Sequence, residues 1–108
     1  MTQRHPLQND AIMFVTTNVA WREKLFLDPG YAREAVDSLY RVQELYPFLL
    51  YGFVIMPDHC HFLCYAPEPI QISSIVRSYK RAASHAISLG PIWQPRFHIA
   101  IPDDASKV

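Results

Sequence analysis

Two histidines one residue apart are the residues of this chain whose types and spacing most clearly suggest chemistry. His59 and His61 fall in residues 59–66 (HCHFLCYA), a run that predicts a β-strand. Side chains two residues apart on a strand point to the same face, roughly 6–7 Å apart at the backbone. Two imidazoles so placed could bind one divalent cation, with water, a substrate oxygen or another residue completing the coordination. The alternative is that they lie near a turn and are only hydrogen-bonded.

The two cysteines of the chain, Cys60 and Cys64, lie in the same run and raise the question of a zinc site. On a strand they face the side opposite His59 and His61, together with Phe62. Ligands divided between two faces cannot enclose one ion, and no second Cys or His cluster has zinc-ribbon spacing. We therefore interpret both cysteines as core residues.

Basic residues are unevenly distributed along this chain, although its net charge is zero. Residues 1–68 carry five Lys or Arg and eight Asp or Glu, whereas residues 69–108 carry five and two. The basic residues between positions 70 and 102, where no acidic residue occurs, are Arg77, Lys80, Arg81 and Arg96. Such a patch suits a phosphate backbone, so we predict that these four side chains contact nucleic acid. The alternative is a solvated basic face.

The hydrophobic pattern predicts the elements that position these residues. β-Branched and aromatic runs indicate strands, and apolar residues that recur every three or four positions indicate helices. In chain order the elements are a strand at residues 11–19, a helix at 31–45, strands at 48–56 and 59–66, a helix from Ser73 or Ser74 to 88, and a strand at 92–101. Residues 28–30 (DPG) indicate a turn. Residues 48–56 (FLLYGFVIM) are almost continuously apolar, which is typical of a central buried strand, and Pro95 indicates an edge or a bulge in the last strand.

The element order is β-α-β-β-α-β, so we predict an α+β, ferredoxin-like fold with a four-stranded antiparallel sheet and two helices on one face. The 108 residues, half of them apolar, form a single domain, 1–108. We expect residues 1–10 to form a loose arm and residues 102–108 to start a C-terminal helix that the chain is too short to complete. No apolar run is long enough to cross a bilayer and no signal peptide is evident, so we expect a cytoplasmic protein without a membrane partner.

Four segments of the sequence, in the same order along the chain, resemble a known family. Residues 52–63 (GFVIMPDHCHFL) resemble the MPxHxHxL hairpin of the HUH single-strand nucleases. More narrowly, they resemble the single-tyrosine transposases of bacterial insertion sequences and their REP-associated relatives. Residues 14–17 (FVTT), 73–81 (SSIVRSYKR) and 92–97 (IWQPRF) are similar to the first strand, the second helix and the WQxRF strand of these transposases.

The resemblance implies a transposase that binds and then cleaves or joins single-stranded or hairpin DNA in DNA transposition. It implies that His59 and His61 hold Mg²⁺ or Mn²⁺, which polarises the scissile phosphate. In the family a tyrosine attacks the phosphorus and forms a 5′-phosphotyrosine bond, which conserves energy for strand transfer. That tyrosine lies on a helix after the WQxRF strand, and the same helix often supplies a third metal ligand. The resemblance leaves open whether the chain forms a homodimer.

This sequence departs from the family pattern at the nucleophile. No tyrosine follows Tyr79, and Tyr79 itself lies in the apolar stripe of its predicted helix, so we interpret it as a core residue rather than a nucleophile. Tyr65 shares a strand face with the histidines and could line the site, but we expect it to pack beneath the second helix. Asp58 replaces the asparagine common before the first histidine. It could tune an imidazole or the metal from outside the ligand set, or only cap the turn.

Two hypotheses therefore stand for the function. The first is a metal-dependent DNA transposase or single-strand endonuclease domain with His59 and His61 as ligands. The second is a non-catalytic, nucleic-acid-binding module of the same fold, a truncated or degenerate relative. Metal at the two histidines discriminates between them, because the second hypothesis needs only the basic surface; the fold alone does not decide.

Overall fold

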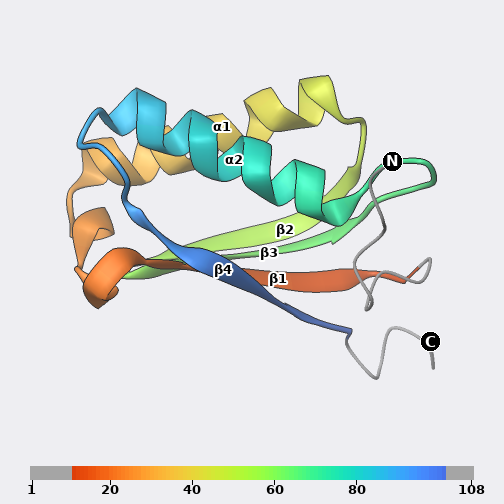
Figure 1. Cartoon of the computed structure of the whole chain (residues 1–108), viewed down its shortest axis with the longest axis horizontal. Helices are drawn as coiled ribbons and strands as arrows, with labels where there is room; N and C mark the ends of the chain where they lie inside the picture. Colours follow the sequence, from red (N-terminus) through yellow and green to blue (C-terminus); the bar gives the residue numbers. More distant parts are fainter. Residues whose placement is uncertain (1–10, 102–108) are drawn as a thin grey trace.

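The computed structural model describes residues 11–101, which form a four-stranded sheet with two helices on one face (Figure 1). In chain order the elements are β1 (Met13–Val19), the 3-10 helices η1 (Ala20–Arg22) and η2 (Leu25–Leu27), α1 (Pro29–Leu45), β2 (Leu49–Met56), β3 (His59–Tyr65), α2 (Ile72–Ile87) and β4 (Trp93–Ala100). The strand order is β2-β3-β1-β4, and neighbouring strands are antiparallel. The predicted ferredoxin-like fold is confirmed.

Three predictions concern the two ends of the chain and its location in the cell. The loose arm predicted at residues 1–10 and the helix start predicted at 102–108 lie outside the described residues. Among residues 11–101, neither helix combines the length and the apolar character that a membrane span requires. The cytoplasmic location stays a prediction.

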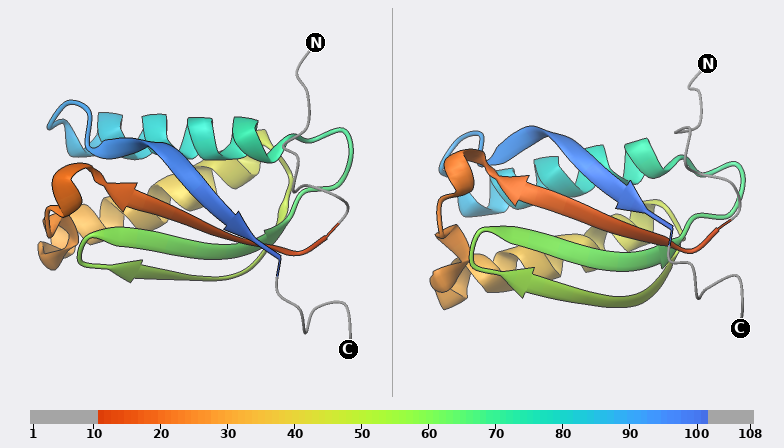
Figure 2. Two further views of the ribbon diagram at one scale, coloured as in Figure 1. Left: turned by 60° about the horizontal axis from the view of Figure 1, so that its bottom comes forward. Right: turned by 90° about the horizontal axis from the view of Figure 1, so that it is seen from below.

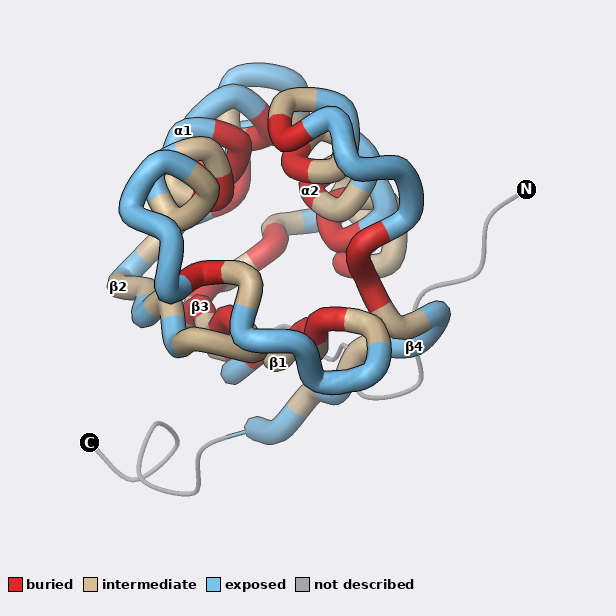
Figure 3. The backbone as a smooth tube through the Cα atoms, turned by 90° about the vertical axis from the view of Figure 1, so that its left-hand side faces the viewer, coloured by how far each residue is buried: buried red, intermediate tan, exposed pale blue. Residues whose placement is uncertain are grey.

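The core lies between the helices and the sheet (Figure 3). Every second residue of β1 from Met13 to Val19 is buried, because side chains that alternate along a strand point in turn to the helices and away from them. Tyr79 of α2 is fully buried in this layer. The opposite face of the sheet, which we call the open face, carries no helix from residues 11–101 (Figure 2).

Helix α1 begins two residues earlier than the sequence predicts. Asp28 is its N-cap: the carboxylate accepts hydrogen bonds from the backbone N–H of Gly30 at 2.8 Å and of Tyr31 at 3.4 Å. Pro29 then fits the first helical position, where the missing N–H costs no hydrogen bond. The residues predicted as a turn are therefore the start of the helix, and that part of the prediction is wrong.

Helix α2 also starts earlier than predicted, before the expected N-cap residues Ser73 and Ser74. The N-cap is Gln71, which makes no side-chain capping bond, and Ser73 and Ser74 lie inside the first turn. The buried stripe explains the early start, since Ile72 is fully buried and holds the first turn against the sheet. The helix ends at Ile87, and its C-cap, Ser88, adopts the left-handed conformation with φ 61°.

The prediction that residues 48–56 form a central strand is wrong, because β2 lies at an edge of the sheet. The apolar side chains of β2 are divided between the two faces of the sheet. The large hydrophobic side chains of β2 that are exposed are Leu49, Tyr51, Val54 and Met56. The prediction for the last strand is confirmed. β4 is the other edge, Pro95 is exposed, and the pairing of β4 with β1 is irregular between Thr17 and Val19.

Candidate functional site

The two histidines of β3 lie together on the open face. Burial alternates along β3, with Cys60, Phe62 and Cys64 buried and the residues between them only partly covered. The imidazole rings of His59 and His61 are 4.6 Å apart between centroids and inclined at 76°. The prediction that both rings share one face is confirmed, and the rings lie close enough to act on the same small ligand.

His59 is held by an ion-paired carboxylate. Its Nδ1 lies 2.6 Å from Oδ1 of Asp58, and Nδ1 donates because a carboxylate only accepts. The other oxygen of Asp58 accepts a hydrogen bond from Nε of Arg22 at 3.0 Å and forms an ion pair with Nη2 of Arg22 at 3.0 Å. The hydrogen bond to His59, followed by the contacts with Arg22, lowers the pKa of Asp58, although partial burial opposes this. Asp58 therefore fixes the ring of His59 and leaves its Nε2 as the nitrogen available to a metal.

His61 is held in a similar way from β1. Thr16, its cross-strand partner, places Oγ1 at 2.9 Å from Nδ1 of His61. In the tautomer that a metal ligand needs, Nδ1 donates to this hydroxyl and Nε2 carries the free lone pair. Phe14 stacks on the ring, with centroids 4.9 Å apart. Burial, and secondarily the nearby His59, lowers the pKa of His61, which favours the neutral imidazole.

This arrangement suits a metal held by two protein ligands. Two imidazoles, each oriented through its Nδ1, are typical donors for a divalent transition metal. Within residues 11–101 no group of three or more His, Cys, Asp or Glu side chains could enclose an ion. Further ligands would therefore come from water, from substrate oxygens or from residues outside this range.

The cysteines and Tyr79 lie on the other side of the sheet. Both thiols are buried, and burial raises the pKa of Cys60 and of Cys64 to about 12, so they are not available as thiolate ligands. The hydroxyl of Tyr79 donates to Sγ of Cys60 at 3.7 Å. Tyr79 is 0% exposed, and burial raises its pKa well above the ordinary value. The predictions that these three residues belong to the core are confirmed.

Tyr65 is placed differently from its prediction. It ends β3 on the same face as His59 and His61, half-buried, with Leu49 of β2 as its cross-strand neighbour. The prediction that it packs beneath the second helix is wrong, because that face points away from both helices. Tyr65 is four residues from His61, which is about 13 Å along an extended strand.

The four predicted basic contacts lie on α2 and β4, but they are not equivalent. Arg77, Arg81 and Arg96 are exposed. Lys80 is half-buried, and its Nζ donates to the backbone oxygen of Gln94 at 2.6 Å, so part of its donor capacity fastens α2 to β4. Burial lowers the pKa of Lys80.

Shallow hollows join α2 to β4 and bring three of these cations together. One, of about 300 Å³, is lined by Arg77, Lys80, Pro95 and Phe97 among others, and a second, of about 240 Å³, by Lys80, Arg81 and residues 91–95 among others. Arg77, Lys80 and Arg81 therefore follow one edge of the molecule. Arg96 lies apart from both hollows on β4.

Sequence reasoning missed the residues that hold the histidines. Thr16 and Arg22 are 45 and 36 residues away from His61 and Asp58 in the sequence, so only strand pairing reveals them. The available signal was the alternation of residues 14–17 (FVTT), which places Phe14 and Thr16 on one face of β1.

Comparisons with known proteins identify the family to which the chain is similar. Residues 10–106 match the family described as transposase IS200 like. A REP-associated tyrosine transposase of Escherichia coli K12 is 33% identical over 85 residues, which cover 78% of this chain and 51% of that protein. The chain therefore spans about half the length of this curated relative.

Two solved structures, both of proteins described as transposases, are similar to this chain. A REP-associated tyrosine transposase bound to a REP hairpin superposes with a TM-score of 0.80 at 27% identity, covering 99% of this chain and 66% of that one. A Deinococcus radiodurans protein provisionally assigned as a transposase has a TM-score of 0.76 at 18% identity, covering 99% of this chain and 90% of that one, and supports the fold alone. Because the family match covers nearly the whole chain, this protein belongs to the IS200-like transposase family.

Proposed function

We propose that this chain is the DNA-binding, metal-binding domain of a single-tyrosine transposase, with single-stranded or hairpin DNA as substrate and His59 and His61 as the metal ligands. The observation that carries the proposal is the orientation of the two rings. Asp58 engages Nδ1 of His59 and Thr16 engages Nδ1 of His61, and the rings are 4.6 Å apart. Each ring then offers Nε2, the nitrogen that a shared ion requires.

The donor set favours Mn²⁺ over Mg²⁺ among the two ions that the family resemblance implies. Imidazole nitrogen is a suitable ligand for transition metals, whereas Mg²⁺ prefers an all-oxygen shell. A metal bound there would supply Lewis-acid polarisation of a DNA phosphate. The protein's own contribution would be to keep both imidazoles oriented, through Asp58 with Arg22 on one side and Thr16 on the other.

DNA as the partner is supported by the solved relative that binds a REP hairpin and by the exposed cations Arg77, Arg81 and Arg96. These guanidinium groups are suited to phosphate oxygens, which set affinity and orientation rather than sequence preference. Phosphate contacts along α2 and β4 would hold the strand while the open face of the sheet presents the histidines.

A non-catalytic DNA-binding module is the second candidate, and the positions of Tyr65 and Tyr79 favour it for these 108 residues taken alone. Tyr79 is buried on the helix side of the sheet, and Tyr65 is about 13 Å along β3 from His61. Neither hydroxyl is placed to attack a phosphate held at the histidine pair. In this reading the chain binds DNA without forming a phosphotyrosine.

A binding titration tests the DNA proposal. We expect a labelled hairpin with a single-stranded flank to bind more tightly than a duplex of equal length. Arg77→Ala and Arg81→Ala are each expected to reduce the slope of log affinity against log salt by about 1, because each removes one phosphate contact. Arg33→Ala, an exposed arginine of α1, is the matched control and is expected to leave the slope unchanged. Equal affinity for hairpin and duplex, or affinity independent of salt, would contradict the proposal.

A further inference from the structure

Trp21 combines full exposure with an unfavourable backbone conformation. Its side chain is 91% exposed, and Trp21 and Arg22 have φ angles of 59° and 53°, in the left-handed region that large residues rarely adopt. Because the indole is not buried, packing into the core does not explain why Trp21 keeps this unfavourable backbone conformation. Strain of this kind at a rigidly held surface residue indicates a binding role.

The segment that carries Trp21 is fastened on both sides. The N–H of Val19 donates to the carbonyl of Asp58 at 2.9 Å, and the N–H of Ala20 donates to the carbonyl of Ile92 at 2.8 Å. Arg22, the residue after Trp21, is ion-paired with Asp58, which in turn holds His59. The indole is therefore presented by a fixed support directly beside the residues that orient the histidine pair.

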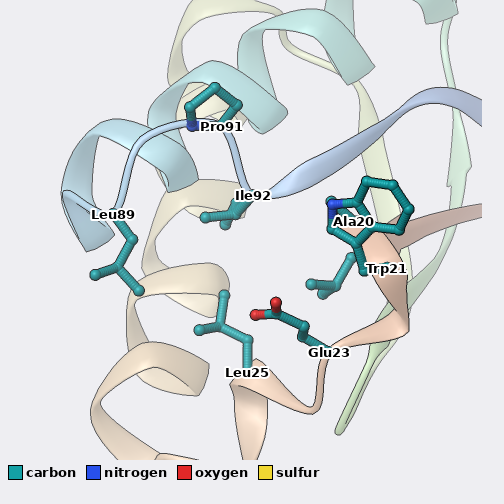
Figure 4. A pocket seen from close by; sticks show the side chains of 8 residues that line it. Ala20, Trp21, Glu23, Leu25, Leu89, Pro91 and Ile92 are labelled. Atoms are coloured by element: carbon teal, nitrogen blue, oxygen red, sulfur yellow. The ribbon is translucent and has the colours of Figure 1, made fainter.

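Two hollows include Trp21 in their walls, and they differ in chemistry. One has a volume of about 450 Å³ and is lined by Ala20, Trp21, Trp93, Gln94 and Pro95. The other, shown in Figure 4, has a volume of about 230 Å³, and the carboxylate of Glu23 points into it between apolar side chains. The larger hollow lies in the size range of small-ligand sites, and the acidic one is unsuited to a polyanion.

We propose that Trp21 is a stacking platform for one unpaired nucleobase of single-stranded DNA, and that the base occupies the hollow between Trp21, Gln94 and Pro95. An indole offers a flat π-surface to any base, and the Gln94 amide offers a donor and an acceptor to a base edge. Pro95 supplies an apolar contact from β4. The proposal rests on the proposed DNA-binding function and adds to it the place where an unpaired nucleotide is held.

Charge in the neighbouring hollow favours a nucleotide over an uncharged aromatic ligand. Gln94 and Pro95 also line the hollow that contains Lys80 and Arg81. The sugar-phosphate backbone on either side of the stacked base would therefore meet cations, as in other single-strand sites that combine aromatic platforms with a basic groove. The hollow beside Trp21 and the hollow that contains Lys80 and Arg81 therefore lie side by side along β4.

The test compares Trp21→Gly, Trp21→Phe and the control Leu45→Ala on a hairpin with a single-stranded flank and on a fully paired duplex. Glycine accepts a positive φ without strain, so Trp21→Gly removes the ring while keeping the backbone, and its Tm is expected to be unchanged or higher. We expect Trp21→Gly to bind the flanked hairpin about 5- to 150-fold more weakly, with an unchanged salt slope. Trp21→Phe should retain most of the affinity, and Leu45→Ala, 72% exposed at the end of α1, should bind as the original chain does.

Tryptophan fluorescence gives an independent readout. The second tryptophan, Trp93, is 9% exposed, so quenching by a single-stranded oligonucleotide should be strong in the original chain and small in Trp21→Phe. If the original chain binds the flanked hairpin and Trp21→Gly binds it equally well, the stacking site is refuted and the DNA-binding function stands. If Trp21→Gly loses duplex and hairpin affinity alike, the indole does not select an unpaired base, and the proposal is also refuted. If the original chain binds neither oligonucleotide, the proposed function fails and the stacking site with it.

Discussion

A Tyr79→Ala variant is expected to lose about 3–5 kcal/mol of its free energy of unfolding. Tyr79 is fully buried and packs against Phe62 of β3 and Trp93 of β4, with ring centroids 5.8 Å apart in both pairs. Removing the ring leaves a cavity where α2 meets the middle of the sheet, and the surrounding rigid elements limit its collapse. Urea unfolding followed by circular dichroism measures the loss. A loss below about 1 kcal/mol would show that the ring is not part of the core.

Tyr79→Phe separates this packing role from a role as nucleophile. It keeps the ring and removes only the hydroxyl that donates to Sγ of Cys60, so a change of about 1 kcal/mol or less is expected. Incubated with Mn²⁺ and a labelled hairpin oligonucleotide, the 108-residue chain and its Tyr79→Phe variant are both expected to form no covalent protein–DNA adduct. An adduct that the original chain forms and Tyr79→Phe does not would contradict the core assignment.

The second large effect is expected at Asp58. Asp58→Ala should weaken Mn²⁺ binding about 10- to 100-fold, because outer partners of a metal-binding imidazole fix its tautomer and orientation. The variant leaves Nδ1 of His59 without its acceptor and frees the side chain of Arg22. Asp58→Asn keeps an acceptor oxygen without the charge, so its Mn²⁺ affinity should lie between those of the original chain and Asp58→Ala.

Isothermal titration with Mn²⁺ measures these affinities. Asp37→Ala, an exposed carboxylate on α1, is the matched control and should leave Mn²⁺ affinity unchanged. Unaltered affinity in Asp58→Ala would mean that the carboxylate only caps the turn, which is the alternative that the sequence left open. Thermal unfolding of each variant checks that the fold is retained.

The local part of the site could be predicted from the sequence because it depends on one strand. A period of two is enough to put His59 and His61 on one face and Cys60 on the other, whichever strands lie beside them. The order of the elements was similarly sufficient for the fold class, since β-α-β-β-α-β with two apolar helices has few compact arrangements.

Predictions that depend on neighbouring strands were less successful. The apolar run in β2 was interpreted as a central strand because both of its faces are apolar, yet one face lies on the open side of the sheet. Tyr65 was misplaced although the alternation in β3 already puts it on the face of His59 and His61, opposite the buried Cys60 and Cys64. Thr16 and Arg22 could not be found without the β1–β3 register and the position of η1 beside the Pro57–Asp58 turn.

Mn²⁺ binding to the original chain and its histidine variants tests most directly whether His59 and His61 form a metal site. The EPR signal of free Mn²⁺ can be followed as chain is added in the presence of a flanked hairpin, with the hairpin alone as the baseline. We predict that the original chain removes one Mn²⁺ per chain from solution, that His59→Ala and His61→Ala remove none beyond the baseline, and that His85→Ala, an exposed histidine on α2, behaves as the original chain does. Equal Mn²⁺ uptake by His59→Ala, His61→Ala and the original chain would contradict a metal site at this histidine pair.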